Sequence, residues 1–175
     1  MSHIIFETSR LIGRKLTPDD TDALYSVYGD AEAMRWVDDG QPLPREECAR
    51  WIDVTHNNYA KRGYGMSALV LRETDMVIGF CGIVHPGGQP QAEIKYALSR
   101  PFWGRGFATE AVRAMLVYGA QTFHLTSIIA TIAPENIASH RVLTKSGMLF
   151  TENRRNEDDT TTSVFTWQPG TANEQ

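Results

Sequence analysis

The chain has 175 residues, of which 42% are hydrophobic and 22% are charged, and these values are ordinary for one globular domain. Its formal net charge is −4, which argues against nonspecific binding to nucleic acid or to anionic membranes, because both partners need a basic surface. No apolar run approaches the ~18 residues that a membrane-spanning helix requires.

The sequence predicts a single domain over residues 1–168 and a flexible C-terminal tail over 169–175, where "PGTANEQ" is small and polar. The opening "MSHIIFETSR" lacks the basic region and apolar core of a secretory signal. With only Cys48 and Cys81, dependence on a disulfide is not expected. We therefore expect a reducing, cytoplasmic location.

No metal site is expected, because the five histidines and two cysteines never fall at ligand-like spacing. Cys81 lies in "VIGFCGIV", which is typical of a buried strand, so a small core side chain is its expected role. His85 follows it at i+4, but these positions lie about 13 Å apart along a strand.

The first third of the chain predicts one strand and two helices. The strand is expected in "RLIGRKLT" (residues 10–17). The first helix is expected to begin at Thr17 and Pro18, which suit the cap and the first helical position. The second is expected from residue 44 or 45 to residue 61, ended by Gly63. A Gly- and Pro-rich connection, "MRWVDDGQPLP", separates the two helices.

The rest of the chain alternates between strands and two further helices. Helical spacing begins at Gly106 and again at Asn136, and Gly147 closes the second of these helices. Strands are predicted over residues 64–72, 76–84, 92–99, 126–133, 148–155 and 160–167. The order is thus β-α-α-β-β-β-α-β-α-β-β. The expected fold class is α+β, with a mixed, mostly antiparallel sheet flanked by helices.

The stretch "FWGRGFATEA" (residues 102–111) places two glycines and an arginine where a strand gives way to a helix. A helix N-terminus has free N–H groups and the positive end of the dipole, and glycines let the backbone approach a bound anion. These features predict a phosphate site, and a tight turn that needs glycine for geometry alone is an equal alternative. The lysine of a P-loop and the acidic residue of a dinucleotide fold are absent, so both nucleotide-binding motifs are disfavoured.

The stretches "AEIKYALSRPFWGRGFATEAV" and "PENIASHRVLTKSGM" follow one another across a predicted strand. They resemble the GNAT acyl-CoA N-acyltransferases, whose pattern Q/R-x-x-G-x-G/A falls on "WGRGFA" with Trp103 in the first slot. The similarity runs from about Thr8 to Trp167 and is nearest to the RimJ/RimL-like branch, named for acetylation of ribosomal-protein N-termini. It implies the GNAT fold, acetyl-CoA as co-substrate, and direct transfer of an acetyl group to a primary amine.

The resemblance also implies where the co-substrate binds. Its pyrophosphate would lie on the amides of the glycine turn, and its pantetheine arm would pair with the preceding strand, whose edge must splay open. Asn136 would contact the coenzyme. The implied cofactor-binding residues are Ala97, Leu98, Ser99, Trp103, Gly104, Arg105, Gly106, Phe107, Ala108, Thr109, Asn136 and Ser139.

Two residues are candidates for the chemistry. Glu93 matches an acidic position of the branch and is the candidate general base, directly or through water; a solvated carboxylate or an amine contact is the alternative. Ser139 is the candidate partner of the CoA sulfur, because Leu143 occupies the slot where many members carry a tyrosine; a plain helix-face hydroxyl is the alternative. A backbone amide near Leu98 is expected to hold the oxyanion.

The acceptor is expected to be recognised by the first two helices and their connection. Trp36, Asp38, Asp39 and Trp51 could attract an ammonium group, although a solvated loop beside a core tryptophan is favoured about two to one. Lys95 stands where the branch often has glycine and is expected to alter the acceptor side.

Two other functions stay open at this point. A noncatalytic acyl-CoA-binding regulatory module would keep the glycine turn and Asn136 without turnover. A protein–protein adaptor would use the turn for its geometry alone. The sequence does not decide between a protein N-terminus and a small-molecule amine as acceptor, and a homodimer is compatible with it.

Overall fold

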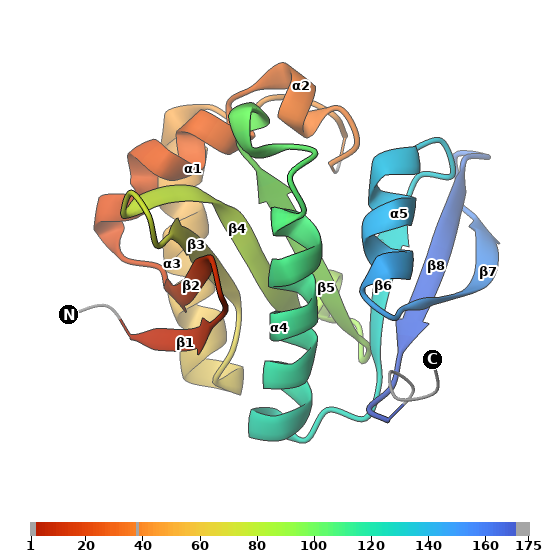
Figure 1. Cartoon of the computed structure of the whole chain (residues 1–175). Coiled ribbons are helices and arrows are strands. Elements are labelled where there is room, and N and C mark those ends of the chain that lie inside the picture. Colours follow the sequence, from red (N-terminus) through yellow and green to blue (C-terminus); the bar gives the residue numbers. More distant parts are fainter. Residues whose placement is uncertain (1–2, 38, 171–175) are drawn as a thin grey trace.

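The computed structural model describes residues 3–37 and 39–170 of the chain. These residues form one eight-stranded sheet in the order β1-β2-β3-β4-β5-β6-β8-β7 (Figure 1). All neighbouring strands are antiparallel except β5 and β6, which are parallel. The strands are β1 (Ile4–Glu7), β2 (Leu11–Lys15), β3 (Met66–Leu71), β4 (Met76–Val84), β5 (Ala92–Leu98), β6 (Ile128–Ile132), β7 (Leu149–Arg155) and β8 (Thr161–Trp167).

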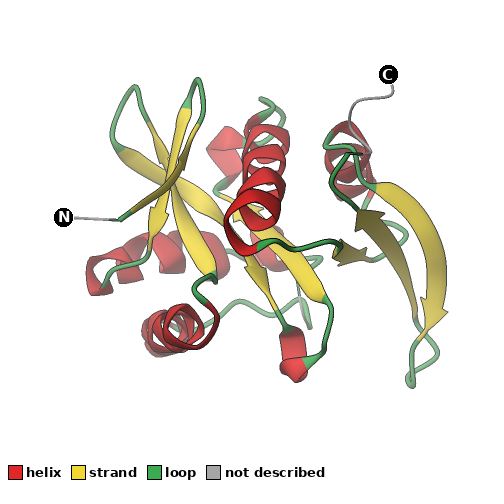
Figure 2. Cartoon of the chain, turned by 90° about the horizontal axis from the view of Figure 1, so that it is seen from below, coloured by secondary structure: helices red, strands yellow, loops and turns green. Residues whose placement is uncertain are grey.

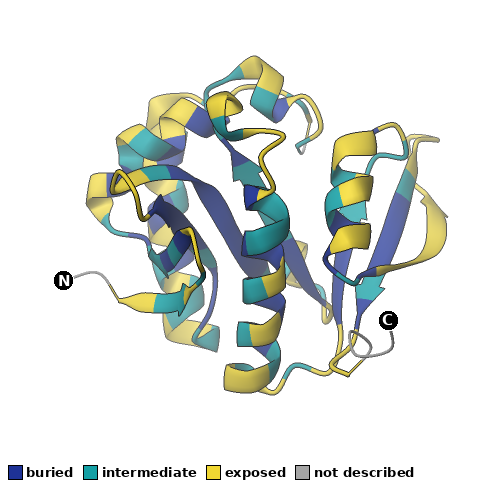
Figure 3. Ribbon diagram, viewed as in Figure 1, coloured by how far each residue is buried: buried dark blue, intermediate teal, exposed yellow. Residues whose placement is uncertain are grey.

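Helices cover both faces of this sheet (Figure 2). They are α1 (Thr21–Tyr28), α2 (Ala31–Met34), α3 (Arg45–Arg62), α4 (Phe107–Phe123) and α5 (Ile137–Lys145). One apolar core lies under α4 and includes Ile83 and Leu116, whereas a second lies under α1 and α3 and includes Leu24 and Phe80. The central strands are therefore buried on both faces, while β7 at the sheet edge is exposed along its whole length (Figure 3).

The predicted α+β class with a mostly antiparallel sheet is confirmed. Two short elements were not predicted from the sequence. β1 has only four residues, of which the middle two are half-buried. It therefore lacks the alternation of apolar and polar residues that would have revealed a strand. α2 is a single turn, which starts where the Asp30 carboxylate accepts the N–H of Glu32 at 3.2 Å.

The first helix begins later than the sequence predicts. Pro18–Asp20 form a 3-10 turn, and α1 starts at Thr21. The carboxylate of Asp20 explains the difference, because it accepts hydrogen bonds from the N–H of Thr17 and from the Nη1 and Nη2 atoms of Arg14, all at 2.8 Å. These bonds fold the chain back on β2 before the helix can form.

β5 and β6 separate soon after they meet. They pair only at Ala92↔Ile128 and Glu93↔Ile129, although β5 continues to Leu98 and β6 to Ile132. The splayed strand edge that the resemblance implied is therefore present. It leaves one edge of β5 open within the sheet, close to the N-terminus of α4.

Candidate functional site

The glycine turn enters α4 through two left-handed backbone positions. Gly104 has φ of 70° and Gly106 has φ of 81°, which only glycine adopts without strain. Gly106 is the N-cap of α4, and its carbonyl accepts the first helical bond, from Glu110 at 3.1 Å. The N–H groups of the next residues, Phe107 to Thr109, have no partner within the helix ladder and point out of its end.

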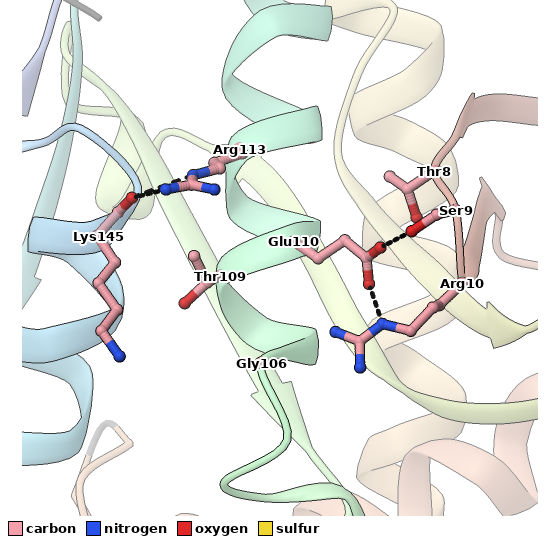
Figure 4. A pocket seen from close by; sticks show the side chains of 8 residues that line it. All are labelled: Thr8, Ser9, Arg10, Gly106, Thr109, Glu110, Arg113 and Lys145. Atoms are coloured by element: carbon pink, nitrogen blue, oxygen red, sulfur yellow. Dashed lines mark hydrogen bonds and ion pairs between the residues drawn. The ribbon is translucent and has the colours of Figure 1, made fainter. Parts of the chain in front are cut away.

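Arg10, from the turn between β1 and β2, braces this helix start (Figure 4). Its Nη1 donates to the carbonyl of Arg105 at 2.9 Å. Its Nε donates to the Glu110 carboxylate at 3.0 Å. Ser9 donates to the other Glu110 oxygen at 2.8 Å. Arg10 could not be identified from the sequence, because its partners lie about a hundred residues away and only the fold brings them together.

A pocket of about 650 Å³ lies beside these contacts of Arg10, and three basic residues and one acidic residue line it. Arg10 and Glu110 form its ion pair, while Arg113 donates to the Lys145 carbonyl at the end of α5 at 3.0 Å. The lining residues are Thr8, Ser9, Arg10, Gly106, Thr109, Glu110, Arg113 and Lys145 (Figure 4). The positive charge at the N-terminal end of α4 therefore exceeds the negative charge.

A larger cavity of about 740 Å³ connects the glycine turn with the opposite face of the sheet. Its wall includes residues of α4 and α5 on one side and of α1, α2 and α3 on the other. Of the predicted cofactor-binding residues, those that line it are Ala97, Leu98, Trp103, Gly104, Gly106, Phe107, Ala108, Thr109, Asn136 and Ser139. Ser99 and Arg105 do not line it; the Arg105 guanidinium lies over the Phe107 ring, 5.1 Å from its centroid.

The open edge of β5 presents alternate peptide groups to this cavity. Ser99 donates its N–H to Ile78 of β4 at 2.9 Å, and Leu98 is paired with Gly79. Hydrogen-bonded and non-hydrogen-bonded pairs alternate along an antiparallel ladder, so the peptide groups of Leu98 and Tyr96 point away from β4. The Leu98 carbonyl accepts the indole N–H of Trp103 at 2.7 Å, in agreement with this direction.

The α5 side of the cavity is organised by Asn136. This residue is the N-cap of α5, and its side-chain oxygen accepts the backbone N–H of Ser139 at 3.2 Å. Ser139 thus stands on the first turn of the helix and faces the cavity. Leu143, in the slot that a tyrosine often fills, is fully buried in the apolar core.

Tyr96 also lines the cavity and is not among the residues predicted from the sequence. Burial raises the pKa of Tyr96 to about 12, while the nearby Ser139 side chain acts in the opposite direction. The phenol oxygen has no hydrogen bond of standard geometry within residues 3–37 and 39–170. The period-two pattern of "AEIKYALS" could have placed it on the Ile94 face, but it could not reveal the missing partner.

Glu93 lies where β5 and β6 part and is 3% exposed. Its carboxylate meets the Lys95 ammonium at 2.7 Å. Lys95 lines the cavity, whereas Glu93 does not. The candidate base therefore does not line the cavity itself, but its ion-pair partner does.

The opposite mouth of the cavity is aromatic. Trp36 and Trp51 line it together with Tyr28, whose ring meets Trp51 edge to face at 4.8 Å between centroids. Asp38 lies outside the described residues. Asp39 does not line the cavity; its carboxylate accepts the N–H of Gln41 at 3.0 Å within the loop.

Residues 3–37 and 39–170 contain neither a metal-binding cluster nor a membrane-spanning helix. In the described part of the chain, no three histidine, cysteine or acidic side chains gather closely enough to bind a metal ion. No helix among the same residues has both the length and the apolar character to cross a membrane.

A sheet of this order, opened beside a glycine turn at a helix N-terminus, is that of the acyl-CoA N-acyltransferases. Comparison with known proteins gives the family. The chain belongs to the GNAT acetyltransferases, since the family described as "Acetyltransferase (GNAT) domain" matches residues 10–149. An uncharacterised N-acetyltransferase of Bacillus licheniformis, p20, is 35% identical over 140 residues, which cover 78% of this chain and 77% of that protein.

Solved structures share the fold. The GNAT-family acetyltransferase from Bacillus anthracis superposes with a TM-score of 0.80 at 22% identity, covering 96% of this chain and 98% of that one. RimL, a ribosomal L7/L12 alpha-N-protein acetyltransferase in complex with coenzyme A, gives 0.80 at 18% identity, with coverage of 95% and 98%. The prediction of an N-acetyltransferase that uses acetyl-CoA is confirmed at the level of the family.

Proposed function

We propose that this chain is a RimJ/RimL-like enzyme that moves an acetyl group from acetyl-CoA to the primary amine of a protein N-terminus or a small molecule. The observation that carries the proposal is the cavity of about 740 Å³, which joins the N-terminus of α4 to the far face of the sheet past the open edge of β5. Donor and acceptor can therefore enter from opposite faces and meet at this edge.

The donor side fits coenzyme A in charge and in shape. The N–H groups at the start of α4 suit a pyrophosphate, and the surrounding basic residues add to that attraction. The peptide groups of Tyr96 and Leu98 that face the cavity suit an extended arm, which would add to β5 as a further strand. Asn136 shapes the α5 wall of the same channel by holding the Ser139 amide.

The proposed chemistry is direct transfer. The amine nitrogen attacks the thioester carbon, the carbon–sulfur bond breaks, and the sulfur keeps the bonding electrons. We assign stabilisation of the oxyanion to the Leu98 N–H and a hydrogen bond to the sulfur to the Ser139 hydroxyl, because both residues line the cavity. Glu93 is the proposed base, and because it does not line the cavity itself, it would receive the amine proton through water.

We infer a protein N-terminus as one candidate acceptor from the likeness to RimL, which is a ribosomal L7/L12 alpha-N-protein acetyltransferase. Trp51 and Tyr28 at this mouth suit an ammonium-bearing group, because aromatic faces attract cations, and the Glu32 carboxylate also lines the cavity. The Trp36 ring already carries the Arg35 guanidinium, 5.0 Å from its centroid. Small amines use the same chemistry, so the acceptor screen must contain both kinds.

Thermal melting with acetyl-CoA, with NADH and ATP as controls, is the first test. At about a hundred times its dissociation constant, acetyl-CoA should add roughly 2.7 kcal/mol and raise Tm by about 5–11 °C. A screen of peptides and small amines, with release of free thiol as readout, should then detect turnover. A rise in Tm with no turnover on any amine would favour the regulatory module, and no rise would contradict the donor site.

Three accompanying proposals are independent of the chemistry. We infer a cytoplasmic location from Cys48 and Cys81, which are both buried and unpaired. We also propose that residues 1–168 behave as one domain and that the protein forms a homodimer. Proteolysis and light scattering test these two proposals directly.

A further inference from the structure

The hydroxyl of Tyr96 is the only buried side-chain oxygen or nitrogen without a standard hydrogen bond among the residues that the structure describes. A phenol buried without a partner costs folding free energy, because its hydrogen bonds to water are lost and not replaced. Such a group in a cavity wall indicates that its partner belongs to a bound molecule.

The position of Tyr96 on β5 fixes what that partner can be. Its side chain lies on the same face as Cys81, its partner on β4, and as the core under α4. Its own peptide group points into the gap between β5 and β6. Ser139 approaches from the first turn of α5 and is close enough to influence the pKa of the phenol. The two hydroxyls thus lie close to each other in the wall of the proposed thioester channel.

We propose that Tyr96 is a further catalytic residue of the transfer site, whose hydroxyl donates a hydrogen bond to the thioester sulfur beside Ser139. The inference rests on the proposed function. As the nitrogen–carbon bond forms and the carbon–sulfur bond breaks, the sulfur gains negative charge, and two hydroxyl donors meet that charge. Tyr96 thereby supplies from β5 the phenol that is absent from α5, where Leu143 is buried in the core.

Tyr96 acts as a donor and keeps its proton. The pKa of Tyr96 is raised to about 12, whereas an ordinary thiol has a pKa of about 8.5. Transfer of the phenol proton to the thiolate would therefore be uphill by more than about three pK units. The proton that the thiolate finally takes is the one released by the amine nitrogen, so atoms and charge balance without a phenolate.

The test is Tyr96→Phe, which removes only the hydroxyl, with Tyr118→Phe on α4 as the matched control outside both cavities. In Tyr96→Phe we expect kcat to fall about 10- to 100-fold, as for one hydrogen bond to a charged group. The ultraviolet absorbance of the thiolate reports ionisation of bound coenzyme A. It should show the thiol pKa about one unit higher than in the unsubstituted protein.

Stability separates this role from a structural one. Removal of an unpartnered buried hydroxyl should leave the Tm of the ligand-free protein unchanged or higher. A lower Tm, or wild-type values of both kcat and bound-thiol pKa, would overturn the proposal. If the unsubstituted protein itself fails to bind coenzyme A, the proposed function fails first, and the two failures are thereby distinguished.

Discussion

The guanidinium of Arg10 and the carbonyl of Arg105 are joined by a hydrogen bond of 2.9 Å that spans 95 positions of sequence. In a trans peptide the N–H points opposite to the carbonyl, so this bond also turns the N–H of Gly106 away from Arg10. Arg10 further neutralises Glu110, whose carboxylate would otherwise repel an anion at the start of α4. One side chain thus sets both the geometry and the charge of the glycine turn.

Replacement of Arg10 by alanine should weaken acetyl-CoA binding by roughly tenfold or more, because a charge-assisted hydrogen bond is lost and Glu110 is left unpaired. Isothermal titration calorimetry measures the change. Arg154→Ala, which breaks an exposed ion pair with Glu152 on β7, is the control. In the Arg10→Ala background, Glu110→Gln should recover part of the affinity; no recovery would count against the electrostatic part of the argument.

Replacement of Gly106 by valine should abolish binding of acetyl-CoA and leave the fold largely intact. A Cβ here meets an Arg10 Nη atom at 3.3 Å, and φ of 81° strains any residue with a side chain by about 1–2 kcal/mol. Gly87→Val is a matched control, since Gly87 also has positive φ but open space around it and no cavity. Normal binding of acetyl-CoA by the Gly106 variant would show that the glycine turn is needed for backbone geometry alone and not for the phosphate site.

Replacement of Glu93 by glutamine should lower kcat/KM about 100-fold if the carboxylate is the base. Lys95→Ala provides the discriminating comparison, because it frees the carboxylate without removing it. Near-normal turnover in Lys95→Ala together with loss in Glu93→Gln would establish the base. Equal losses in both variants would instead assign Glu93 to the support of Lys95.

Replacement of Ser139 by alanine should reduce kcat by roughly tenfold, with little change in KM for acetyl-CoA, because its hydroxyl is expected to act on the departing sulfur. The Asn136 oxygen keeps its bond to the backbone N–H of this position, so α5 should start as before. Circular dichroism checks that the helix remains. An unchanged kcat would mean that Ser139 lines the cavity without taking part in the reaction.

Acid should destabilise the chain through Asp20. Burial opposes its charged form, but the bonds from Arg14 and Thr17 prevail and hold the pKa of Asp20 below its usual value. Its contribution is therefore present above the unfolded pKa of about 3.9 and is lost as pH falls through the lowered folded pKa. Asp20→Asn should cost about 3 kcal/mol at neutral pH, because it leaves Arg14 unpaired, and should flatten the acid limb of a urea-melting series.

Much of the fold could be predicted because the elements are locally consistent. β4 coincides with the predicted 76–84 strand, and α3 ends at Gly63, whose φ is 88°. β1 and α2 were missed because each is too short to show periodicity. The start of α1 was misplaced because Asp20 bonds Arg14, six residues earlier, in preference to capping the helix.

The site could be predicted only in part from sequence. The glycine turn and the strand before it are local motifs, and most of their predicted residues line one cavity. Arg10 and Tyr96 depend on tertiary contacts. Arg10 lies beside Arg105 only after folding, and the Tyr96 hydroxyl is distinctive because it is buried without a hydrogen bond of standard geometry. The ion pair of Glu93 with Lys95 belongs to the same class, since alternation places both on one face but does not fix their contact.

The divergence of β5 from β6 also bears on how the sheet holds together. Strands β1 to β5 and strands β6 to β8 share a ladder of only two residue pairs, at Ala92 and Glu93. Otherwise the two parts are joined by side-chain packing, in the core under α4 and between α4 and α5. We therefore expect local unfolding that separates the unit of β6, β7, β8 and α5 to begin at this short ladder. The pantetheine arm of bound acetyl-CoA, paired with β5, would lie between β5 and β6. It would link the two parts of the sheet, so that they unfold together. The backbone amides of β6 and β8 should accordingly exchange their hydrogens more slowly as the concentration of acetyl-CoA is raised.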